Sequence, residues 1–383
     1  MPYSASCIYN NRMNDLNNLQ TRLFVSALGL LLLVAGLLPA GGSGEAEPVA
    51  DEESTENAGP ALPGLKTGAG EVETASTARV LQHSPEAFVD SMMSGGPPPD
   101  GIPSIDQPRF VAPEEAELAP GDPIIGLAHG GVVRAYPQRI LVYHEIVNQT
   151  VGGENLAVTY CPLTATAQAF KSGSTTLGVS GRLVNSNLVM YDRDTGSLWP
   201  QIGGTAVAGP RKGESLEEVE VYWTSWENWL EMHPETEVLS TDTGHARNYN
   251  RDPYGSYNPA GGYYTSPRTM FPLMEEGDRY ETKQMVLGAR NSERAVYFDL
   301  ESLAGRGIQE TESFIAVYDR ELETGHIYEK NGNRRFRYEE GMAVDTETGD
   351  RFAPGELPFT SLVSIEGFYF AWAAFYPESE HPR

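Results

Sequence analysis

From about Gly121 onward, short apolar runs alternate with turns rich in Gly, Asn and Asp. The runs have the length of strands, about four to eight residues, and most of them lack the spacing of an amphipathic helix. The pattern therefore predicts a mainly β fold, α+β at most, in which a few short helices join two related β-rich units. The clearest predicted strands are residues 123–127, 157–160, 175–179, 188–191, 285–287 and 314–318.

Two segments have the pattern of helices. The first, YPQRIL, is entered through Pro137, which suits the start of a helix. The second, TSWENWLEMHP at residues 224–234, has Thr224 three residues before Glu227, the spacing of a capping box, and Pro234 ends it. Its tryptophans share one face, which favours burial in a core over a platform for a ligand.

Three sequence landmarks occur twice, in the same order and at similar spacing. IIGLAHGGVVRAYPQRIL (124–141) resembles VLGARNSERAVYFDLESL (286–303), VTYCP resembles AVYDR, and YDRDTGSLW resembles VDTETGDRF. We interpret them as two copies of one β-rich unit, residues 119–222 and 284–378, which form either one domain or two. The capped helix and a tyrosine-rich loop lie between the copies, at 223–283.

An apolar segment near the N-terminus predicts export. Residues 23–40, LFVSALGLLLLVAGLLPA, carry no charge and follow residues 1–22, which end in an arginine. This order is typical of a signal peptide, and the length also suits a membrane anchor. We therefore expect an extracytoplasmic protein, secreted or anchored, that contacts the membrane only through this segment. Residues 41–118 are acidic and rich in Pro and Gly, which predicts a linker and an extended lead-in.

Charge narrows the range of partners. The chain carries 53 acidic and 27 basic residues, a formal net charge of −26, and only five of the basic residues are lysines. Residues 76–383 alone carry 44 acidic and 24 basic side chains, a net charge of −20. A field of that sign repels nucleic acid and anionic lipid, so neither is an expected partner. An acidic surface poor in lysine favours adaptation to high salt over mere solubility.

Candidate chemistry centres on Cys161. The other cysteine, Cys7, lies before the apolar segment, so the exported chain has no partner for an intramolecular disulfide.

A hairpin brings a histidine near this thiol. The turn signal GGEN at 152–155 separates two apolar runs and predicts a pairing in which Ile146 faces Cys161. His144 then shares that face as a diagonal neighbour, and Glu145 points to the opposite face.

One histidine and one cysteine on a shared face allow three interpretations. In the first, Cys161 is the nucleophile and His144 the base of a thiol-dependent enzyme. In the second, the two side chains are ligands of copper or another soft metal. In the third, Cys161 is a small buried apolar residue and His144 is a hydrogen-bonded structural residue.

Other candidate ligand-binding residues lie in two segments. Tyr191 and Asp192 belong to YDRDTG, where Asp-Thr-Gly is also an ordinary turn. Arg251, Asp252 and Tyr254 begin the loop RDPYGSYNPAGGYY, whose tyrosines and glycines suit a binding rim.

Several long motifs resemble one known family. RAYPQRILVYHEIVNQTVGG, VTYCPLTATA, GVSGRLVNSNLVMYDRDTGSLWPQ, RDPYGSY and FYFAWAAFYPES are similar to segments of the domain of unknown function 3179 family, over most of residues 119–378. The resemblance implies an exported bacterial or archaeal protein and no known activity. Family members carry C-P-L-C-G-T where this chain has CPLTAT from Cys161 to Thr166, so Thr164 replaces the second cysteine and a dithiol function is not implied.

The sequence thus predicts an extracytoplasmic domain that binds a small ligand or a soft metal near Cys161 and His144. A thiol-dependent enzyme and a structural cell-surface module are the alternatives. No protein partner is indicated.

We expect the folded region to need salt. Because residues 76–383 carry a net charge of −20, self-repulsion should destabilise the fold in dilute buffer, and molar potassium chloride should screen it. Thermal unfolding should show a melting temperature higher by a few degrees in salt, equivalent to about 1 kcal/mol. A melting temperature that does not rise with salt would contradict the high-salt interpretation.

Overall fold

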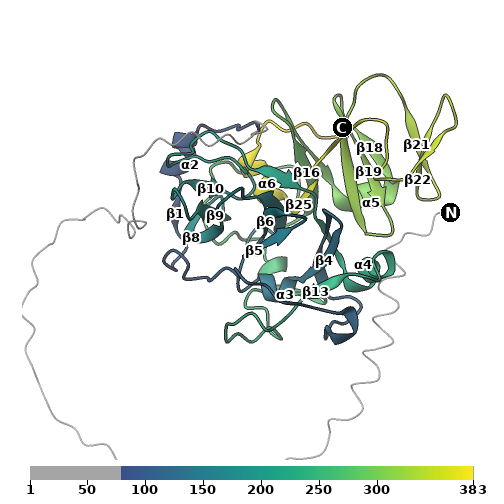
Figure 1. Ribbon diagram of the computed structural model, residues 1–383. Helices are drawn as coiled ribbons and strands as arrows, with labels where there is room; N and C mark the ends of the chain where they lie inside the picture. Colours follow the sequence, from purple (N-terminus) through teal and green to yellow (C-terminus); the bar gives the residue numbers. More distant parts are fainter. Residues whose placement is uncertain (1–78, 383) are drawn as a thin grey trace, which may run out of the picture. The chain divides into compact units, whose positions relative to one another are not determined.

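Antiparallel hairpins and meanders account for most of the secondary structure, and the helices between them are short (Figure 1). The computed structural model describes residues 79–382, which all lie in one compact unit. Strands contain 39% of the residues and helices 12%, so the predicted mainly β class is confirmed. The apolar segment at 23–40 and the predicted linker up to residue 78 lie outside the described residues.

The elements before the tyrosine-rich loop are mostly strands, and the first fifteen run from α2 to β12. In chain order they are α2 (Pro85–Asp90), β1 (Met93–Ser94), β2 (Phe110–Val111), η1 (Pro113–Glu115), β3 (Pro123–His129), β4 (Val132–Pro137), α3 (Gln138–Leu141), β5 (Ile146–Val151), β6 (Glu154–Cys161), β7 (Thr166–Lys171), β8 (Leu177–Val184), β9 (Asn187–Asp192), β10 (Leu198–Pro200), β11 (Glu217–Val219) and β12 (Tyr222–Ser225). They are followed by α4 (Trp226–Met232) and β13 (Glu237–Leu239).

The remaining elements start in the tyrosine-rich loop. In chain order they are β14 (Gly255–Tyr257), β15 (Ala260–Gly262), η2 (Tyr263–Thr265), β16 (Met285–Arg290), β17 (Ala295–Asp299), α5 (Leu300–Arg306), β18 (Ile308–Glu310), β19 (Phe314–Asp319), β20 (Thr324–Glu329), β21 (Phe336–Glu339), β22 (Met342–Asp345), β23 (Arg351–Phe352), β24 (Thr360–Leu362), β25 (Ile365–Phe368) and α6 (Tyr369–Phe375).

Two sets of these elements have the same order and the same pairing. In the first set, strands β11-β7-β6-β5 form a four-stranded sheet, and β12-β3-β4 are neighbours in a second sheet. In the second set, β24-β20-β19-β18 form a four-stranded sheet and β25-β16-β17 a three-stranded one. Helices α3 and α5 follow the first hairpin of each set, and α4 and α6 close the sets. The two sets therefore share an order of elements, in which α4 and α6 hold equivalent places, and the duplication itself stays a prediction.

The closing helix of each set packs on a glycine of the neighbouring strand. A Cβ atom at Gly126 in β3 would lie closer than 3.0 Å to the ring of Trp229 in α4. A Cβ atom at Gly288 in β16 would lie equally close to the ring of Trp372 in α6. The missing side chains let the two indoles approach the strand backbone, and both indoles are buried.

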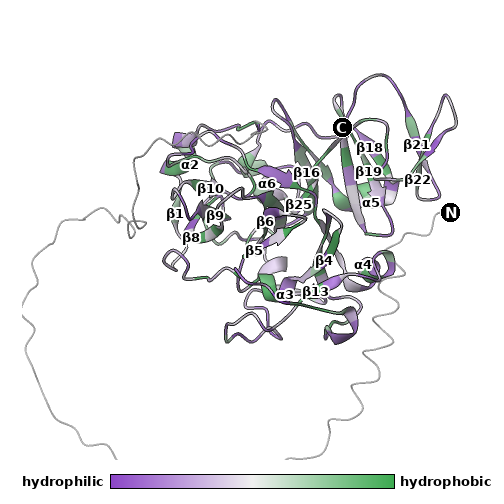
Figure 2. Ribbon diagram, in the orientation of Figure 1, coloured by the Kyte–Doolittle hydropathy of each residue, from purple (hydrophilic) through white to green (hydrophobic). Residues whose placement is uncertain are grey.

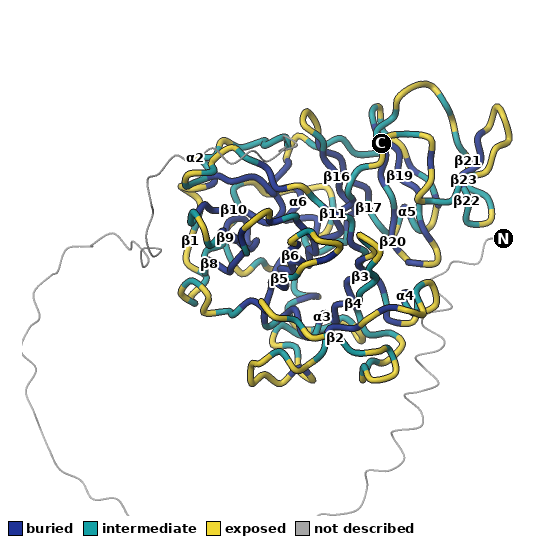
Figure 3. Tube along the Cα trace, in the orientation of Figure 1, coloured by how far each residue is buried: buried dark blue, intermediate teal, exposed yellow. Residues whose placement is uncertain are grey.

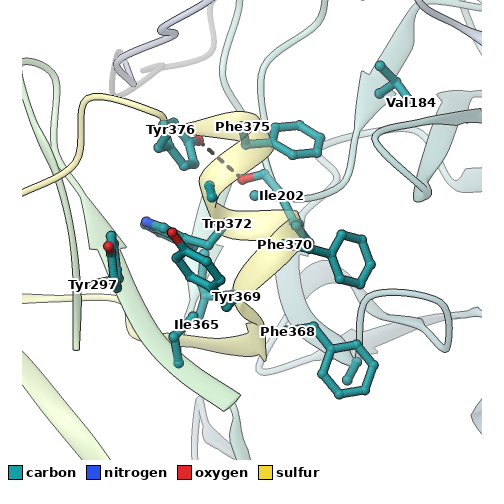
Figure 4. Close-up of a cluster of buried hydrophobic side chains, with 14 of the residues drawn as sticks. Val184, Ile202, Tyr297, Ile365, Phe368, Tyr369, Phe370, Trp372, Phe375 and Tyr376 are labelled. Carbon is teal, nitrogen blue, oxygen red and sulfur yellow. Dashed lines mark hydrogen bonds between the residues drawn. The ribbon is translucent and has the colours of Figure 1, made fainter. Parts of the chain in front are cut away.

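Helix α6 is buried on every side. All seven residues of its sequence YFAWAAF are buried, which is the pattern of a core helix. Figure 4 shows Tyr369 and Trp372 on the side of Tyr297, and Phe370 and Phe375 on the other side of the helix. The helix therefore lies in one buried cluster with apolar side chains of β8, β9 and β10 and of β16, β17 and β25.

Burial follows the strands rather than the loops (Figure 3). Many strands carry both hydrophobic and hydrophilic residues along their length (Figure 2), as expected of strands with one buried face. The lead-in takes part in this core from residue 79 onward, because Phe88 in α2 and Ile105 are each only 1% exposed. Among residues 79–382, no helix is both long and apolar enough to span a membrane.

The capped helix differs from its prediction by one residue. Ser225 is the N-cap, and its hydroxyl accepts the N–H of Asn228. Thr224, the predicted cap, belongs to β12 instead. The predicted burial of the two tryptophans, Trp226 and Trp229, is confirmed.

We expect Gly126→Ala and Gly288→Ala each to lower the free energy of unfolding by about 1–3 kcal/mol, because the added methyl group collides with a packed indole. Gly305→Ala in α5 is the matched control, since nothing lies within 4 Å of its Cβ position. Alanine there should be neutral or stabilise by up to about 1 kcal/mol. Chemical denaturation of the three variants measures this, and equal effects at Gly126 and Gly305 would contradict the contact.

Candidate functional site

The hairpin that carries Cys161 has a different register from the predicted one. Ile146 pairs with Thr159, two residues before Cys161, so the predicted pairing is wrong. The reason is the turn, which consists of Gly152 and Gly153 alone, both with positive φ. A shift of two residues keeps the face, so Ile146 and Cys161 still belong to the same buried cluster.

The thiol of Cys161 is enclosed and hydrogen-bonded. The residue is 1% exposed. Its Sγ accepts the N–H of Leu188 at 3.4 Å and lies 3.8 Å from the carbonyl oxygen of Ser186, to which it donates. Burial, with a smaller contribution from the nearby Glu145 carboxyl, raises the pKa of the thiol to about 11. At neutral pH the side chain is therefore a neutral thiol rather than a thiolate.

Both ring nitrogens of His144 have other partners. Nδ1 lies 2.7 Å from the carbonyl oxygen of Pro103, which can only accept, and Nε2 lies 2.6 Å from the hydroxyl of Tyr249. Burial lowers the pKa of the imidazole to about 4, so it is neutral, donates through Nδ1 and accepts through Nε2. Within residues 79–382, no hydrogen bond or ring contact joins His144 to Cys161.

The side chain of Glu145 does not lie where the predicted hairpin put it. It was expected on the face opposite Cys161, yet its carboxyl is close enough to raise the pKa of the thiol. Its φ of 58° interrupts the alternation of side chains just before β5 begins. Glu145 is 7% exposed and, among the described residues, its carboxyl has no hydrogen-bond or ion-pair partner. Burial raises the pKa of this carboxyl to about 8.

Thr164, which stands where the family has its second cysteine, takes part in a buried hydrogen-bond network through its hydroxyl. The Thr164 hydroxyl lies 2.8 Å from that of Thr166 and accepts from the side-chain amide of Asn187 at 3.0 Å. The amide oxygen of Gln201 accepts from Thr166 and Asn187. Threonine therefore satisfies its neighbours at a site where a thiol would be a weaker partner.

A cavity of about 430 Å³ lies beside the tyrosine-rich loop. Two of the predicted ligand-binding residues, Arg251 and Asp252, line it, and Tyr254 contributes through its backbone N–H, which donates to Asp252 at 2.7 Å. The predicted residues did not include four other polar residues that line the cavity. Gln138 and Arg139 come from a distant segment, whereas Tyr249 and Tyr257 lie close in sequence to the predicted residues.

Asp252 is held by a hydrogen-bond network at the edge of this cavity. Its Oδ2 accepts from the hydroxyl of Tyr264 at 2.7 Å and from the amide of Gln138 at 2.9 Å. The same amide lies 3.2 Å from the hydroxyl of Tyr160, which is 3.0 Å from that of Tyr257. The rings of Tyr257 and Tyr264 are stacked, with centroids 4.0 Å apart.

Tyr191 and Asp192 lie in a different part of the structure. The Tyr191 hydroxyl donates to Asp100 at 2.5 Å. Asp192 is buried and accepts from the N–H of Thr195 at 2.7 Å and from the indole of Trp199 at 3.1 Å. The contacts of Asp192 are therefore those of an ordinary Asp-Thr-Gly turn, which was the structural interpretation of this segment.

A larger cavity, of about 570 Å³, lies beside the turn between β19 and β20. Its most buried acid, Asp319, already accepts the N–H groups of Glu321 and Leu322 and lies 3.4 Å from His326. Within residues 79–382, no group of three or more His, Cys, Asp and Glu side chains is placed to hold a metal ion.

Comparison with known proteins gives one match. The family model described as "Protein of unknown function (DUF3179)" matches residues 99–379, and this is the family that the sequence motifs resemble. No curated protein and no solved structure matches the chain.

We expect Cys161 to be a slow nucleophile. In a Cys7→Ser variant it is the only thiol, and with a pKa of about 11 its alkylation by iodoacetamide at pH 8 should be at least about a hundredfold slower than that of a free cysteine. The rate in denaturant is the internal control. Fast labelling of the folded protein below pH 8 would contradict this expectation and favour the thiol enzyme.

Cys161→Ser should separate packing from metal binding. Serine leaves a hydroxyl in a site shaped for sulfur, so unfolding should become easier by about 1–3 kcal/mol. The metal content of protein purified without an affinity tag should not change. Loss of a bound metal with an intact fold would restore the soft-metal interpretation.

Proposed function

The chain belongs to the DUF3179 family, and from that premise we propose that it is a binding domain for a small polar molecule, held in the cavity beside the tyrosine-rich loop. The observation that carries the proposal is the convergence of polar side chains from distant segments on one cavity of about 430 Å³, a volume typical of small-molecule sites.

The cavity has a rigid side. Both oxygens of Asp252 are engaged, one by the Tyr254 N–H and the other by Gln138 and Tyr264. These bonds fix the carboxylate and the stacked tyrosines before any ligand arrives. Preorganised polar groups bind more tightly because no ordering is needed on binding.

The cavity also has free donors. Arg251 is exposed, and its guanidinium has no partner among the described residues. Nε of Arg139 is buried and has no hydrogen-bond acceptor in residues 79–382, while its Nη2 donates to the carbonyl oxygen of Glu117 at 2.7 Å. Tyr249 and Tyr257 add aromatic surface. Hydroxyl-rich molecules with an acceptor for a guanidinium, such as sugars and sugar acids, match these groups.

The other interpretations have less support. A nucleophilic Cys161 needs a base, and both nitrogens of His144 are engaged elsewhere. A soft metal at Cys161 and His144 would need the imidazole to give up Pro103 or Tyr249. A structural cell-surface module would not require a polar cavity. We place the function outside the cytoplasm on the strength of residues 23–40, and the negative charge argues against nucleic acid as a partner.

The proposal predicts saturable binding that depends on Arg251. The full-length protein is titrated by calorimetry with neutral monosaccharides, the corresponding uronic acids and free amino acids. We expect at least one class to bind, and Arg251→Ala to weaken it about tenfold or more, since a hydrogen bond to a charged group contributes about 1.5–3 kcal/mol.

Arg247→Ala is the matched control. Arg247 is exposed on the same segment and does not line the cavity. Within the described part of the chain, its guanidinium bonds only to the carbonyl oxygen of Ala246, through Nη1. Its removal should leave the affinity unchanged. Absence of binding in all three classes, or equal loss in both variants, would count against the cavity as the functional site.

A further inference from the structure

Two guanidinium groups share one carboxylate in the interior. Arg290, at the end of β16, places Nη2 2.6 Å from Oε1 of Glu218 in β11. Arg79 places Nη2 2.9 Å from Oε2 of the same carboxylate. The side chains of Arg290 and Glu218 are 0% and 3% exposed, and that of Arg79 is 12% exposed. The group therefore carries one positive charge in excess, almost entirely out of water.

Three N–H groups of these arginines have no acceptor. Nε and Nη1 of Arg290 and Nε of Arg79 are buried and unpaired among residues 79–382. A buried donor without an acceptor costs about 1–3 kcal/mol, and more when the group is charged. Folded proteins leave few such donors empty, so these three call for an acceptor other than the atoms of residues 79–382.

Neighbouring protein groups do not supply the missing negative charge. The ring centroid of Tyr376 lies 5.7 Å from the guanidinium carbon of Arg290, and the phenol interacts with this guanidinium. Burial raises the pKa of the phenol to about 12, so it stays neutral and adds no negative charge. Figure 4 shows the hydroxyl of Tyr376 directed to the carbonyl oxygen of Ile202. Glu220, two residues from Glu218, accepts the N–H of Ser364, and burial raises the pKa of its carboxyl to about 8.

We propose that Arg290 and Arg79 hold a small inorganic anion of the chloride class beside Glu218. A monatomic anion accepts several N–H groups without demanding a fixed geometry, and it neutralises the excess charge where the dielectric constant is low. The site joins the two sets of elements, because β11 belongs to the first set and β16 to the second. Bound anion therefore stabilises their association, independently of any ligand in the cavity.

The overall charge makes this site dependent on salt. A net charge of −20 on residues 76–383 opposes the entry of anions in dilute buffer. Salt screens that field and also supplies the anion, so the site should fill only as the chloride concentration rises.

The test compares thermal unfolding of the full-length chain in potassium chloride and in potassium gluconate at equal ionic strength. Screening is the same in both salts, and gluconate is a much larger anion than chloride. We expect a higher melting temperature in chloride, with a saturable dependence on its concentration. Arg290→Gln should remove most of this increment, whereas Arg294→Gln, at a 54% exposed arginine four residues away, should keep it.

If Arg290→Gln does not fold, Glu218→Gln provides a second test of anion binding. Removing the carboxylate leaves two guanidinium groups for the anion, so half-saturation by chloride should move to a concentration at least tenfold lower. A purely structural ion pair would instead lose the same stability in both salts. Crystals grown in bromide should show an anomalous peak within hydrogen-bond distance of Arg290. Equal melting temperatures of the unmodified protein in the two salts, or water in place of bromide, would overturn the proposal.

Discussion

The turn between β8 and β9 is buried, and the elements around it are arranged to satisfy its polar groups. Asn185 and Ser186 both have positive φ, and neither is more than 2% exposed. A buried turn must find its hydrogen-bond partners inside the protein, since no water reaches it. The Asn185 side chain bonds to the N–H of Met274 and to the carbonyl oxygen of Ala374 in α6, and the Ser186 carbonyl accepts from the Cys161 thiol. One two-residue turn thus contacts the end of β6, the segment before β16 and helix α6.

The hairpin β8–β9 lies between β7 and β11 of the first set, and the hairpin β21–β22 lies between β20 and β24 of the second, where a similar turn has a different environment. Glu340 and Gly341, between β21 and β22, also have positive φ, but the Glu340 side chain is 86% exposed. Water satisfies that turn, so it needs none of the side-chain partners that surround Asn185. The loops that follow β9 and β22 are alike. The backbone carbonyl oxygens of Asp192 and Asp345 each accept the N–H of the glycine four residues later. The two sets therefore share the order of their elements but differ at this hairpin, because the turn of β8–β9 is buried and that of β21–β22 is exposed. The enclosed thiol and the cavity belong to the first set and to the segments packed on it.

Local patterns in the sequence predict more of this structure than of its interior chemistry. Short apolar runs bounded by Gly, Asn and Asp were enough for the β class, and the spacing of Trp226 and Trp229 was enough for their burial. The pairing at Cys161 was wrong because a four-residue turn signal contains a two-residue glycine turn, and only the three-dimensional register decides between them. The position of Glu145 was wrong because a positive φ at a residue other than glycine has no signature in the sequence. The contact between Arg290 and Glu218 joins residues 72 positions apart, which no local pattern encodes.

The distribution of positive charge links the surface to the two proposed sites. A chain this acidic gains little from isolated surface ion pairs, which contribute about 0–1 kcal/mol and weaken further in salt. A guanidinium inside the protein is different, because water and ions do not screen it and its unpaired N–H groups must be satisfied. Arg290 is such a group in the core, and Arg139 has one buried unpaired N–H at the cavity. Both proposed sites thus offer N–H groups that are unpaired among the described residues, in a protein whose net charge repels anions, and for this reason the two proposals assign small acceptors to them.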